Sequence, residues 1–161
     1  MSLTVRQYLT VLIFEVDGHR YGLDASQIIE VVRAVQPGRL AQAPDIVEGI
    51  INVRGRLAVV VDLRARFELT RRPIVPSDVL LLSEINGRLY ALRADATLEL
   101  QTVEASQLAD SETAGGSFAR GGLTTADGVL VLCDLKAFLD EAEQLSLSRA
   151  LARREAWGES A

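Results

Sequence analysis

The feature of this 161-residue sequence that most constrains its fold is an internal repeat. Residues 15–23 match residues 84–92 at an offset of 69, and residues 49–63 match residues 122–135 at an offset of 72 to 73. Self-similarity at about 70 residues indicates two copies of one structural unit. A unit of this size buries too little surface to be stable alone, so we expect the copies to pack together. The seam between them is the natural place for a groove.

Both copies are predicted to be mainly β. Each begins with two β-forming runs around a two-residue turn, Asp17-Gly18 in the first copy and Asn86-Gly87 in the second. These dipeptides favour the type I′ turn of a β-hairpin, because both central residues must adopt positive φ. Residues 26–35 fit a short helix and a strand almost equally well. The slip of one residue in the second matched pair indicates a bulge or a changed turn.

The repeat also predicts how the chain is divided. The two copies span about residues 9–70 and 78–140, and they are separated by the proline-containing stretch Thr70–Ser77, a predicted linker. Residues 109–122 contain four glycines among Ser, Thr and Asp, and we expect a mobile loop there.

The tail of the chain is predicted to be helical. Apolar residues recur with helical spacing from residue 135, which predicts a helix over about 135–157 that includes the tail 141–161. The expected buried stripe consists of Leu135, Phe138, Leu139, Ala142 and Leu145.

Composition excludes several classes of partner. The formal net charge is −5, which argues against nucleic-acid binding and against docking on an anionic membrane. The longest apolar runs have about five residues, far fewer than the roughly 20 of a membrane-spanning helix. Cys133 is the sole cysteine and cannot form an internal disulfide, so we expect a cytoplasmic protein.

The residues that most often carry catalysis are scarce. The single histidine, His19, follows a predicted turn, and Cys133 reads as a small buried residue on a strand. Asp62 and Asp134 each end an apolar run and are better N-caps of short helices than catalytic groups. No zinc-type spacing and no phosphate-binding glycine loop is present. The sequence therefore predicts no enzyme, no metal and no cofactor.

Several motifs, in order and with matching gaps, resemble the CheW-like domain family over roughly residues 9–140. The most specific part is the run from Gly49 through Asn52 and Arg54 to Gly55, followed by Val-Asp-Leu at residues 61–63. The other matching segments are Phe14–Val16, Tyr21–Asp24, Glu30-Val31, Ala43-Pro44, Val47, Ala91–Asp95, Gly122 and Leu130–Leu135. The resemblance implies a mainly β fold of two packed five-stranded small β-barrels, with short helices and a C-terminal helix.

The resemblance also implies a function. Proteins of this family are non-catalytic adaptors that couple the cytoplasmic tips of chemoreceptors to the regulatory domain of the histidine kinase CheA, in flagellar or non-flagellar chemosensory pathways. Receptor helices dock in the groove between the barrels, and kinase domains bind at barrel ends. An adaptor of this kind transmits a signal only if its contacts differ between the two signalling states.

Candidate partner-binding residues follow from the matching motifs. Arg54 either contacts a partner at the groove or braces the turn before Gly55, and Ile28 is either a groove residue or plain core. Asn52 is expected to stabilise the same turn through backbone bonds. Arg93 and Thr97 depart from the apolar character of the family here, and they are expected to place a positive charge and a hydroxyl near the surface.

A second class of function is a small-ligand sensor. In that case the groove between the barrels would hold a metabolite, and convergent polar residues would line it. Asn52, Arg93 and Thr97 are the candidate lining residues.

Overall fold

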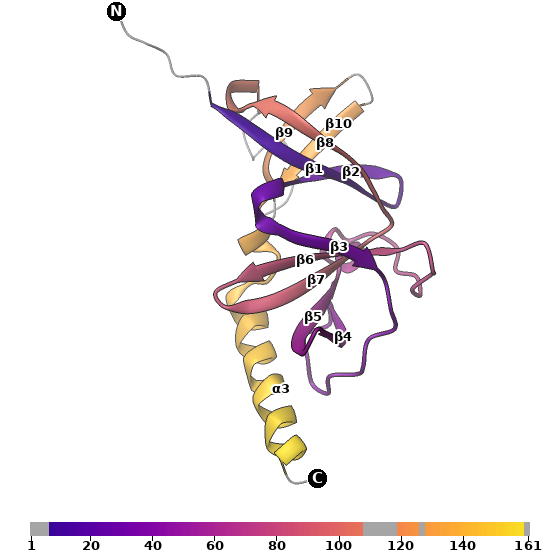
Figure 1. Cartoon of the computed structure of the whole chain (residues 1–161), viewed down its shortest axis with the longest axis vertical. Coiled ribbons are helices and arrows are strands. Elements are labelled where there is room, and N and C mark those ends of the chain that lie inside the picture. The colour runs from indigo at the N-terminus through magenta and orange to yellow at the C-terminus, as the bar shows by residue number, and fades with distance from the viewer. Residues whose placement is uncertain (1–6, 108–118, 126–127, 160–161) are drawn as a thin grey trace, which may run out of the picture.

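Two five-stranded sheets and one long C-terminal helix make up the fold (Figure 1). The computed structural model describes residues 7–107, 119–125 and 128–159. The predicted mainly β fold with two five-stranded units, short helices and a C-terminal helix is confirmed. Among the described strands no pairing joins β8 to β9 or β3 to β4, so the sheets are open and not closed barrels.

The first sheet has the order β8-β1-β2-β10-β9 and the second β3-β6-β7-β5-β4. The strands of the first are β1 (Tyr8–Val16), β2 (His19–Asp24), β8 (Ala96–Glu104), β9 (Ala119–Thr125) and β10 (Gly128–Cys133). Those of the second are β3 (Ile28–Arg33), β4 (Val47–Val53), β5 (Arg56–Asp62), β6 (Val79–Ile85) and β7 (Arg88–Ala94). The helical segments are η1 (Ala25–Gln27), α1 (Leu63–Arg66), η2 (Ala105–Gln107), η3 (Leu135–Ala137) and α3 (Glu141–Glu159).

The sheets do not follow the sequence repeat. When β1 to β5 are matched to β6 to β10, the order of one sheet becomes the order of the other. Each sheet therefore combines the hairpin of one copy with the last three strands of the other. The expectation that each copy forms its own β unit is thus corrected, because the parallel pairs β2–β10 and β5–β7 join strands from different copies. Parallel neighbours require long connections, which the distance between the copies supplies.

The register of the two parallel pairs reproduces the repeat. Tyr21 lies opposite Val131 in the first sheet, and Tyr90 lies opposite Val59 in the second. These pairs are related by offsets of 69 and 72. The expected slip of one residue is wrong. β5 begins at Arg56 and β10 begins at Gly128, so the offset between the two strands is 72 from their first residues onward.

Both predicted hairpins are confirmed. Asp17 and Gly18 have φ of 52° and 76°, and Asn86 and Gly87 have φ of 51° and 80°, as a type I′ turn requires. The ambiguous stretch after the first hairpin is the strand β3, preceded by a single 3₁₀ turn.

The two aspartates that follow apolar strands are N-caps, as predicted. Asp62 accepts a hydrogen bond from the backbone N–H of Arg64 at 3.0 Å, and Asp134 accepts one from Lys136 at 3.1 Å. Asp62 is the last residue of β5 and Asp134 follows the last residue of β10, and each begins a short helical turn that packs into the core.

The C-terminal helix begins later than predicted. The turn η3 ends near residue 137, and a capping box restarts the chain as α3: Glu143 N–H donates to the Asp140 carboxylate at 2.7 Å, and Asp140 N–H donates to Glu143 at 3.0 Å. The helical phase changes at this break. The predicted stripe is therefore wrong beyond Leu139, because Leu145 is 52% exposed whereas Leu147 and Ala150 are buried.

The segment predicted as a glycine-rich loop divides in two. Residues 109–118 lie outside the described residues, and Ala119–Gly122 belong to β9. No helix or strand covers Thr70–Ser77, as expected of a linker. In the described part of the chain, no helix is long and apolar enough to cross a membrane.

The largest hydrophobic cluster lies between the sheets and the helical segments. At its centre Tyr21 stacks on Phe67 with ring centroids 4.1 Å apart, and Phe67 meets Phe138 edge-on at 6.0 Å. Burial raises the pKa of Tyr21 to about 12. Two smaller clusters cover the opposite faces of the two sheets.

Candidate functional site

The edge strands β3 and β8 occupy equivalent positions in the two sheets and carry equivalent bulges. Ile29 is the extra residue of β3 against β6, and Leu98 is the extra residue of β8 against β1. The two are 69 residues apart, so the bulge is part of the repeat. A bulge redirects side chains and interrupts pairing, and it is frequent at sheet edges and next to functional sites.

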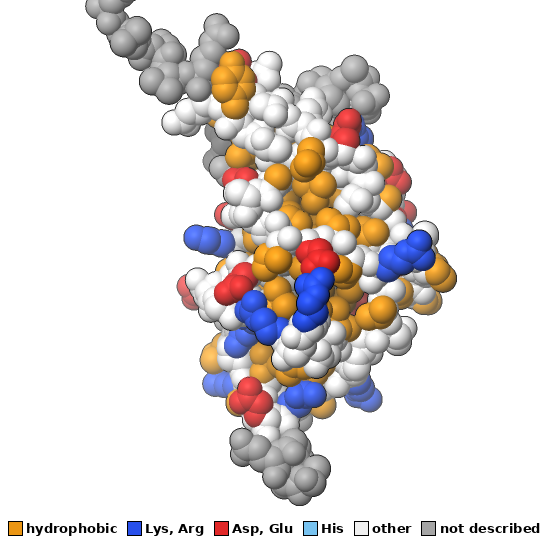
Figure 2. Space-filling model, viewed as in Figure 1, with side chains coloured by type: hydrophobic (Ala, Val, Ile, Leu, Met, Phe, Trp, Pro, Cys, Tyr) orange, Lys and Arg blue, Asp and Glu red, His pale blue; other side chains and the backbone are white. Residues whose placement is uncertain are grey.

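Exposed apolar side chains lie along both bulged strands. Ile29 and Val31 on β3 are 57% and 39% exposed, and Leu98 and Leu100 on β8 are 45% and 63% exposed. Figure 2 shows a face of the molecule on which hydrophobic side chains lie over both sheets. Edge strands with exposed apolar residues invite association, so natural proteins retain them mainly where a partner binds. We name these four residues the edge-strand surface.

A charged pair lies beside this surface. Nη2 of Arg54 is 2.7 Å from both carboxylate oxygens of Glu30, the residue between Ile29 and Val31. The Arg54 side chain is 72% exposed. The hydrogen bond from Arg54 to Glu30 is the main cause of the raised pKa of the Arg54 guanidinium. The guanidinium thus bonds across to β3 and not to the turn in which Arg54 stands.

The turn between β4 and β5 holds Arg54 in this position. Arg54 and Gly55 have φ of 49° and 85°, the left-handed region that a two-residue hairpin turn requires. The Asn52 side chain accepts a hydrogen bond from the Gly55 N–H at 2.8 Å. The predicted role of Asn52 in stabilising the turn is confirmed.

The first glycine of the motif has a different role. Ile50, the residue after Gly49, pairs with Gly38 through two backbone hydrogen bonds of 2.8 Å, which attach the connection between β3 and β4 to the sheet. A Cβ at Gly49 would lie 2.1 Å from the Gly38 carbonyl oxygen, and its φ is 152°. Glycine is required at this close approach of two backbones.

Arg93 is buried, which corrects the expectation of a surface charge. Its exposed fraction is 5%. Its Nε donates to Glu48 at 2.8 Å, and its terminal nitrogens lie 3.1 Å from Asp78 and 3.5 Å from Asp62. It also donates to the backbone carbonyl of Arg72 in the linker. The departure from the family pattern at Arg93 therefore builds an internal ion cluster.

The cluster extends through the linker to the other sheet. Arg72 lies 2.7 Å from Asp78 and 2.9 Å from Asp95, and Arg64 lies 2.7 Å from Asp95 and 3.3 Å from Asp17. Asp17 belongs to the β1–β2 turn, so a chain of ion pairs runs from the second sheet to the first. Sequence reasoning missed this cluster, because nothing in the spacing of its arginines and aspartates indicates that they meet.

Burial and hydrogen bonding oppose each other in setting the pKa values of the carboxyl groups in this cluster. Burial raises the pKa of the Glu48 carboxyl, and this outweighs the hydrogen bond from Arg93. Burial also opposes ionisation of Asp78, but hydrogen bonds from Arg72, the Val75 N–H and Arg93 together outweigh it and hold its pKa below the ordinary value.

Ile28 and Thr97 are equivalent in the repeat and flank the two bulges. Both are half-buried, and Ile28 packs against the largest hydrophobic cluster. Thr97 lies opposite Phe14 in the pairing of β8 with β1. The structure thus places both next to the edge-strand surface but partly beneath it. The offset of 69, applied to Ile29 and Val31, would have identified Leu98 and Leu100 as well.

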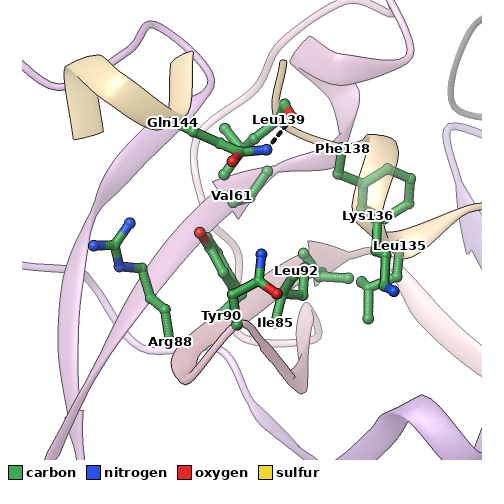
Figure 3. Close-up of a pocket in the computed structure, with 11 residues that line it drawn as sticks. Val61, Ile85, Arg88, Tyr90, Leu92, Leu135, Lys136, Phe138, Leu139 and Gln144 are labelled. Atoms are coloured by element: carbon green, nitrogen blue, oxygen red, sulfur yellow. Dashed lines mark hydrogen bonds between the residues drawn. The ribbon is translucent and has the colours of Figure 1, made fainter. Parts of the chain in front are cut away.

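The polar residues considered for a ligand site do not converge. Asn52 stands at the turn end of β4, Arg93 at the opposite end of the second sheet, and Thr97 in the first sheet. A cavity of about 220 Å³ opens instead where η3 and α3 meet the second sheet, and both apolar and polar side chains form its walls (Figure 3). It is lined by Val61, Ile85, Asn86, Arg88, Tyr90, Leu92, Leu135, Lys136, Phe138, Leu139 and Gln144. None of the three predicted ligand residues lines it, so the small-ligand function is not favoured.

In the part of the chain that the structure describes, the cysteine predicted to be inert is buried and no metal-binding cluster is assembled. Cys133 is fully buried on β10, as predicted, and burial raises the pKa of its thiol far above the ordinary value. Among the described residues, no cluster of three His, Cys, Asp or Glu side chains is arranged to hold a metal ion.

Comparisons with known proteins agree with this architecture. The sequence model of the CheW-like domain matches residues 10–143. The chemotaxis protein CheW of Klebsiella aerogenes is 24% identical over 136 residues, which cover 82% of each chain. The chemotaxis protein CheW of Rhizobium meliloti is 22% identical over 138 residues, 83% of this chain and 89% of the relative.

A solved structure is similar over nearly its whole length. The scaffolding protein TtCheW of Thermoanaerobacter tengcongensis matches with a TM-score of 0.77 at 25% sequence identity, covering 85% of this chain and 96% of its own. The family match spans most of the residues that form the two sheets. The chain belongs to the CheW-like domain family.

Proposed function

We propose that this protein couples the cytoplasmic tip of a chemoreceptor to the regulatory domain of a CheA-type histidine kinase in a bacterial chemosensory array. As a CheW-like protein it is a non-catalytic adaptor, and its work in the cytoplasm is to hold two partners in one assembly.

The observation that carries this proposal is the edge-strand surface. The four side chains Ile29, Val31, Leu98 and Leu100 are exposed at equivalent bulged edges of two different sheets. A rod-like helical receptor tip that contacts both edges would bury apolar residues at helical spacing against them. Ile28 and Thr97 support this surface from beneath, and we assign the receptor contact here.

Arg54 is proposed to contribute specificity. An exposed ion pair such as Arg54–Glu30 contributes little to folding stability, because water and salt screen it. A carboxylate on the partner can therefore take the guanidinium at small cost, and charged contacts at an interface mainly select the partner and speed association. Asn52 and Gly55 act indirectly, by holding Arg54 in its turn. Arg93 stabilises the second sheet through its buried ion pairs, and we do not propose that it contacts a partner.

The apolar contribution is tested with Ile29→Asp and Leu98→Asp. We expect each to weaken binding of a receptor-tip fragment at least tenfold in isothermal titration calorimetry, with little effect on the melting temperature. Leu145→Asp is the matched control, since Leu145 is 52% exposed on α3, away from the edge strands. Equal weakening by all three variants would contradict the assignment of the surface.

The role of Arg54 is tested with a charge exchange. Arg54→Glu is expected to weaken receptor or kinase binding and to leave the melting temperature within a few degrees, whereas Arg56→Glu, at another exposed ion pair, leaves binding unchanged. Adding Glu30→Arg to Arg54→Glu restores the intramolecular pair with reversed polarity. Binding that stays weak supports a direct contact of Arg54 with a partner. Restored binding shows that only the internal pair matters, and unfolding of Arg54→Glu shows that Arg54 braces the turn.

A further inference from the structure

The second sheet seats the C-terminal helix on a surface built by β5 and β7. A hollow of about 410 Å³ marks this contact. From the sheet side it is lined by Arg56, Leu57, Val59, Asn86, Gly87, Arg88 and Leu89, and from α3 by Ser148, Leu151, Ala152 and Glu155. Two nitrogens of Arg88 lie 3.5 Å from the Ser148 hydroxyl oxygen. We name the strand side of this contact the helix seat.

The helix begins over the same sheet. Figure 3 shows Gln144 of α3 beside Leu139, to whose backbone carbonyl its side chain donates a hydrogen bond of 2.9 Å. Farther along, Leu147 and Ala150 are buried in the largest hydrophobic cluster, and Leu151 packs against it. These three positions give α3 an apolar edge at the i, i+3 and i+4 spacing that a seated helix requires.

The first sheet carries the counterpart of this seat on β2 and β10. By the offsets of 69 and 72, His19 corresponds to Arg88, Val129 to Leu57, and Val131 to Val59. A hollow of about 380 Å³ lies here, and it is lined by Gly18, His19, Arg20, Tyr21, Val129 and Val131. No residue of a described helix is among them.

The apolar residues of the helix seat are less exposed than their counterparts on β2 and β10. This is the difference expected if α3 covers the first surface and no helix covers the second. Val59 is 2% exposed beneath α3, whereas its counterpart Val131 is half-buried. Leu57 is 41% exposed and its counterpart Val129 is 63% exposed, the most exposed valine of the described residues.

The different courses of the chain explain why only one seat is covered. After η3 the chain continues directly into α3, which returns along the second sheet. After α1, the counterpart of η3, the chain enters the linker Thr70–Ser77, which arginine and aspartate side chains hold in the ion cluster. The linker leads straight into β6, so the first copy has no helix to place on β2 and β10.

We propose that the surface of β2 and β10 binds an amphipathic helix of a partner protein, in the manner in which β5 and β7 bind α3. The occupied seat defines the chemistry of that helix. It carries aliphatic residues at i, i+3 and i+4 to cover Val129 and Val131. On the other sheet Leu151 lines the hollow together with Leu57 and Val59, and Leu147 and Ala150 belong to the same hydrophobic cluster as Val59. The partner helix carries a hydroxyl or carboxylate one residue after the first aliphatic position, as Ser148 follows Leu147. This group would face His19, the counterpart of the Arg88 that contacts Ser148. This contact is separate from the edge-strand surface and does not depend on the proposed receptor and kinase binding.

The test uses α3 itself as the probe. A synthetic peptide of residues 141–155, held helical by a lactam bridge between Glu and Lys placed at positions 145 and 149 on its exposed side, is titrated into the full ¹⁵N-labelled chain. We expect saturable shifts of the backbone amide signals of β2 and β10. Val129→Asp is expected to weaken binding at least tenfold without unfolding the chain, since Val129 is 63% exposed. The same peptide with Leu147→Asp and Leu151→Asp is expected not to bind.

Three outcomes overturn the proposal. Absence of shifts at millimolar peptide shows that the surface does not accept a helix. Shifts confined to β5, β7 and α3, lost in Leu57→Asp, show that the peptide only exchanges with the chain's own helix. Dimerisation of the peptide-free chain that Val129→Asp abolishes, measured by sedimentation equilibrium, shows that a second copy covers the surface and not a partner helix.

Discussion

The Arg64 guanidinium lies 2.7 Å from the Asp95 carboxylate and 3.3 Å from that of Asp17. Arg64 belongs to α1, at the end of the second sheet, and Asp17 to the first hairpin turn of the first sheet. The backbone N–H of Asp17 also donates to the Asp95 side chain at 2.8 Å. Arg64 and Asp95 thus connect the two sheets at the point where β7 passes into β8.

We predict that Arg64→Ala destabilises the protein by roughly 3 kcal/mol, the usual cost of breaking a largely buried ion pair by removing one partner. Two carboxylates would lose their common cation, and the Thr70 carbonyl would lose its donor. Arg56→Ala is the control, since the Arg56–Glu84 pair is about half exposed and such pairs contribute at most about 1 kcal/mol. Urea denaturation measures both, and equal losses would contradict the inter-sheet role of Arg64.

Asp78→Asn is expected to destabilise the protein at pH 7 and to reduce its sensitivity to acid. The folded pKa of Asp78 lies below the ordinary 3.8, so ionised Asp78 contributes stability above that pH. This contribution is lost as the pH falls through the lowered pKa. Denaturation at pH 7 and pH 3 should therefore show a larger acid loss in the parent chain than in the variant.

Glu48→Gln supplies the control of opposite sign. The raised pKa of Glu48 means that its ionised form is disfavoured in the fold, so protonation on acidification relieves a cost. The variant should therefore lose more stability than the parent between pH 7 and pH 3. An unchanged pH dependence in both variants would contradict the cluster electrostatics.

Gly49→Ala is expected to cost more than about 3 kcal/mol, at the upper end of single substitutions. Its Cβ would lie 2.1 Å from the backbone oxygen of Gly38, and Gly38 cannot move away without breaking its two hydrogen bonds to Ile50, the residue after Gly49. Gly38→Ala is the matched control, because its Cβ would meet the Ile50 oxygen at an ordinary 3.6 Å. Thermal unfolding of the two variants compares them directly, and similar melting temperatures would be incompatible with the close approach.

Cys133 is expected to resist thiol reagents in the native protein. Burial raises the pKa of its thiol, so the reactive thiolate is scarce at neutral pH, and no exposed surface admits the reagent. Reaction with a disulfide reagent should become complete only in denaturant. Rapid labelling of the folded chain at pH 7.5 would contradict the buried position on β10.

Much of the local structure was predictable because its causes are local. The Asp17-Gly18 and Asn86-Gly87 turns follow from the positive φ that these residues tolerate, and the Asp62 and Asp134 caps follow from the orphan amides at a helix start. The helix boundary near Asp140 was not predicted, although the capping box with Glu143 is visible in the sequence, because apolar residues at helical spacing continue through it.

The candidate site was only partly predictable. The motif around Asn52, Arg54 and Gly55 was identified from the sequence, and the structure adds the contact of Arg54 with Glu30, 24 residues away. Arg93 was expected at the surface, since a lone arginine in a strand gives no sign of the carboxylates that bury it.

By itself the sequence determined a twofold repeat of one pattern of strands, its hairpins, its caps and the family motifs, all of which depend on neighbouring residues or on self-similarity. Only the tertiary structure decided that each sheet takes strands from both copies, and that one of two equivalent surfaces is covered by α3. The physical reason is that strand pairing and helix packing join residues far apart in the chain. Which partners meet is then decided by the burial of whole surfaces, and no local pattern records it.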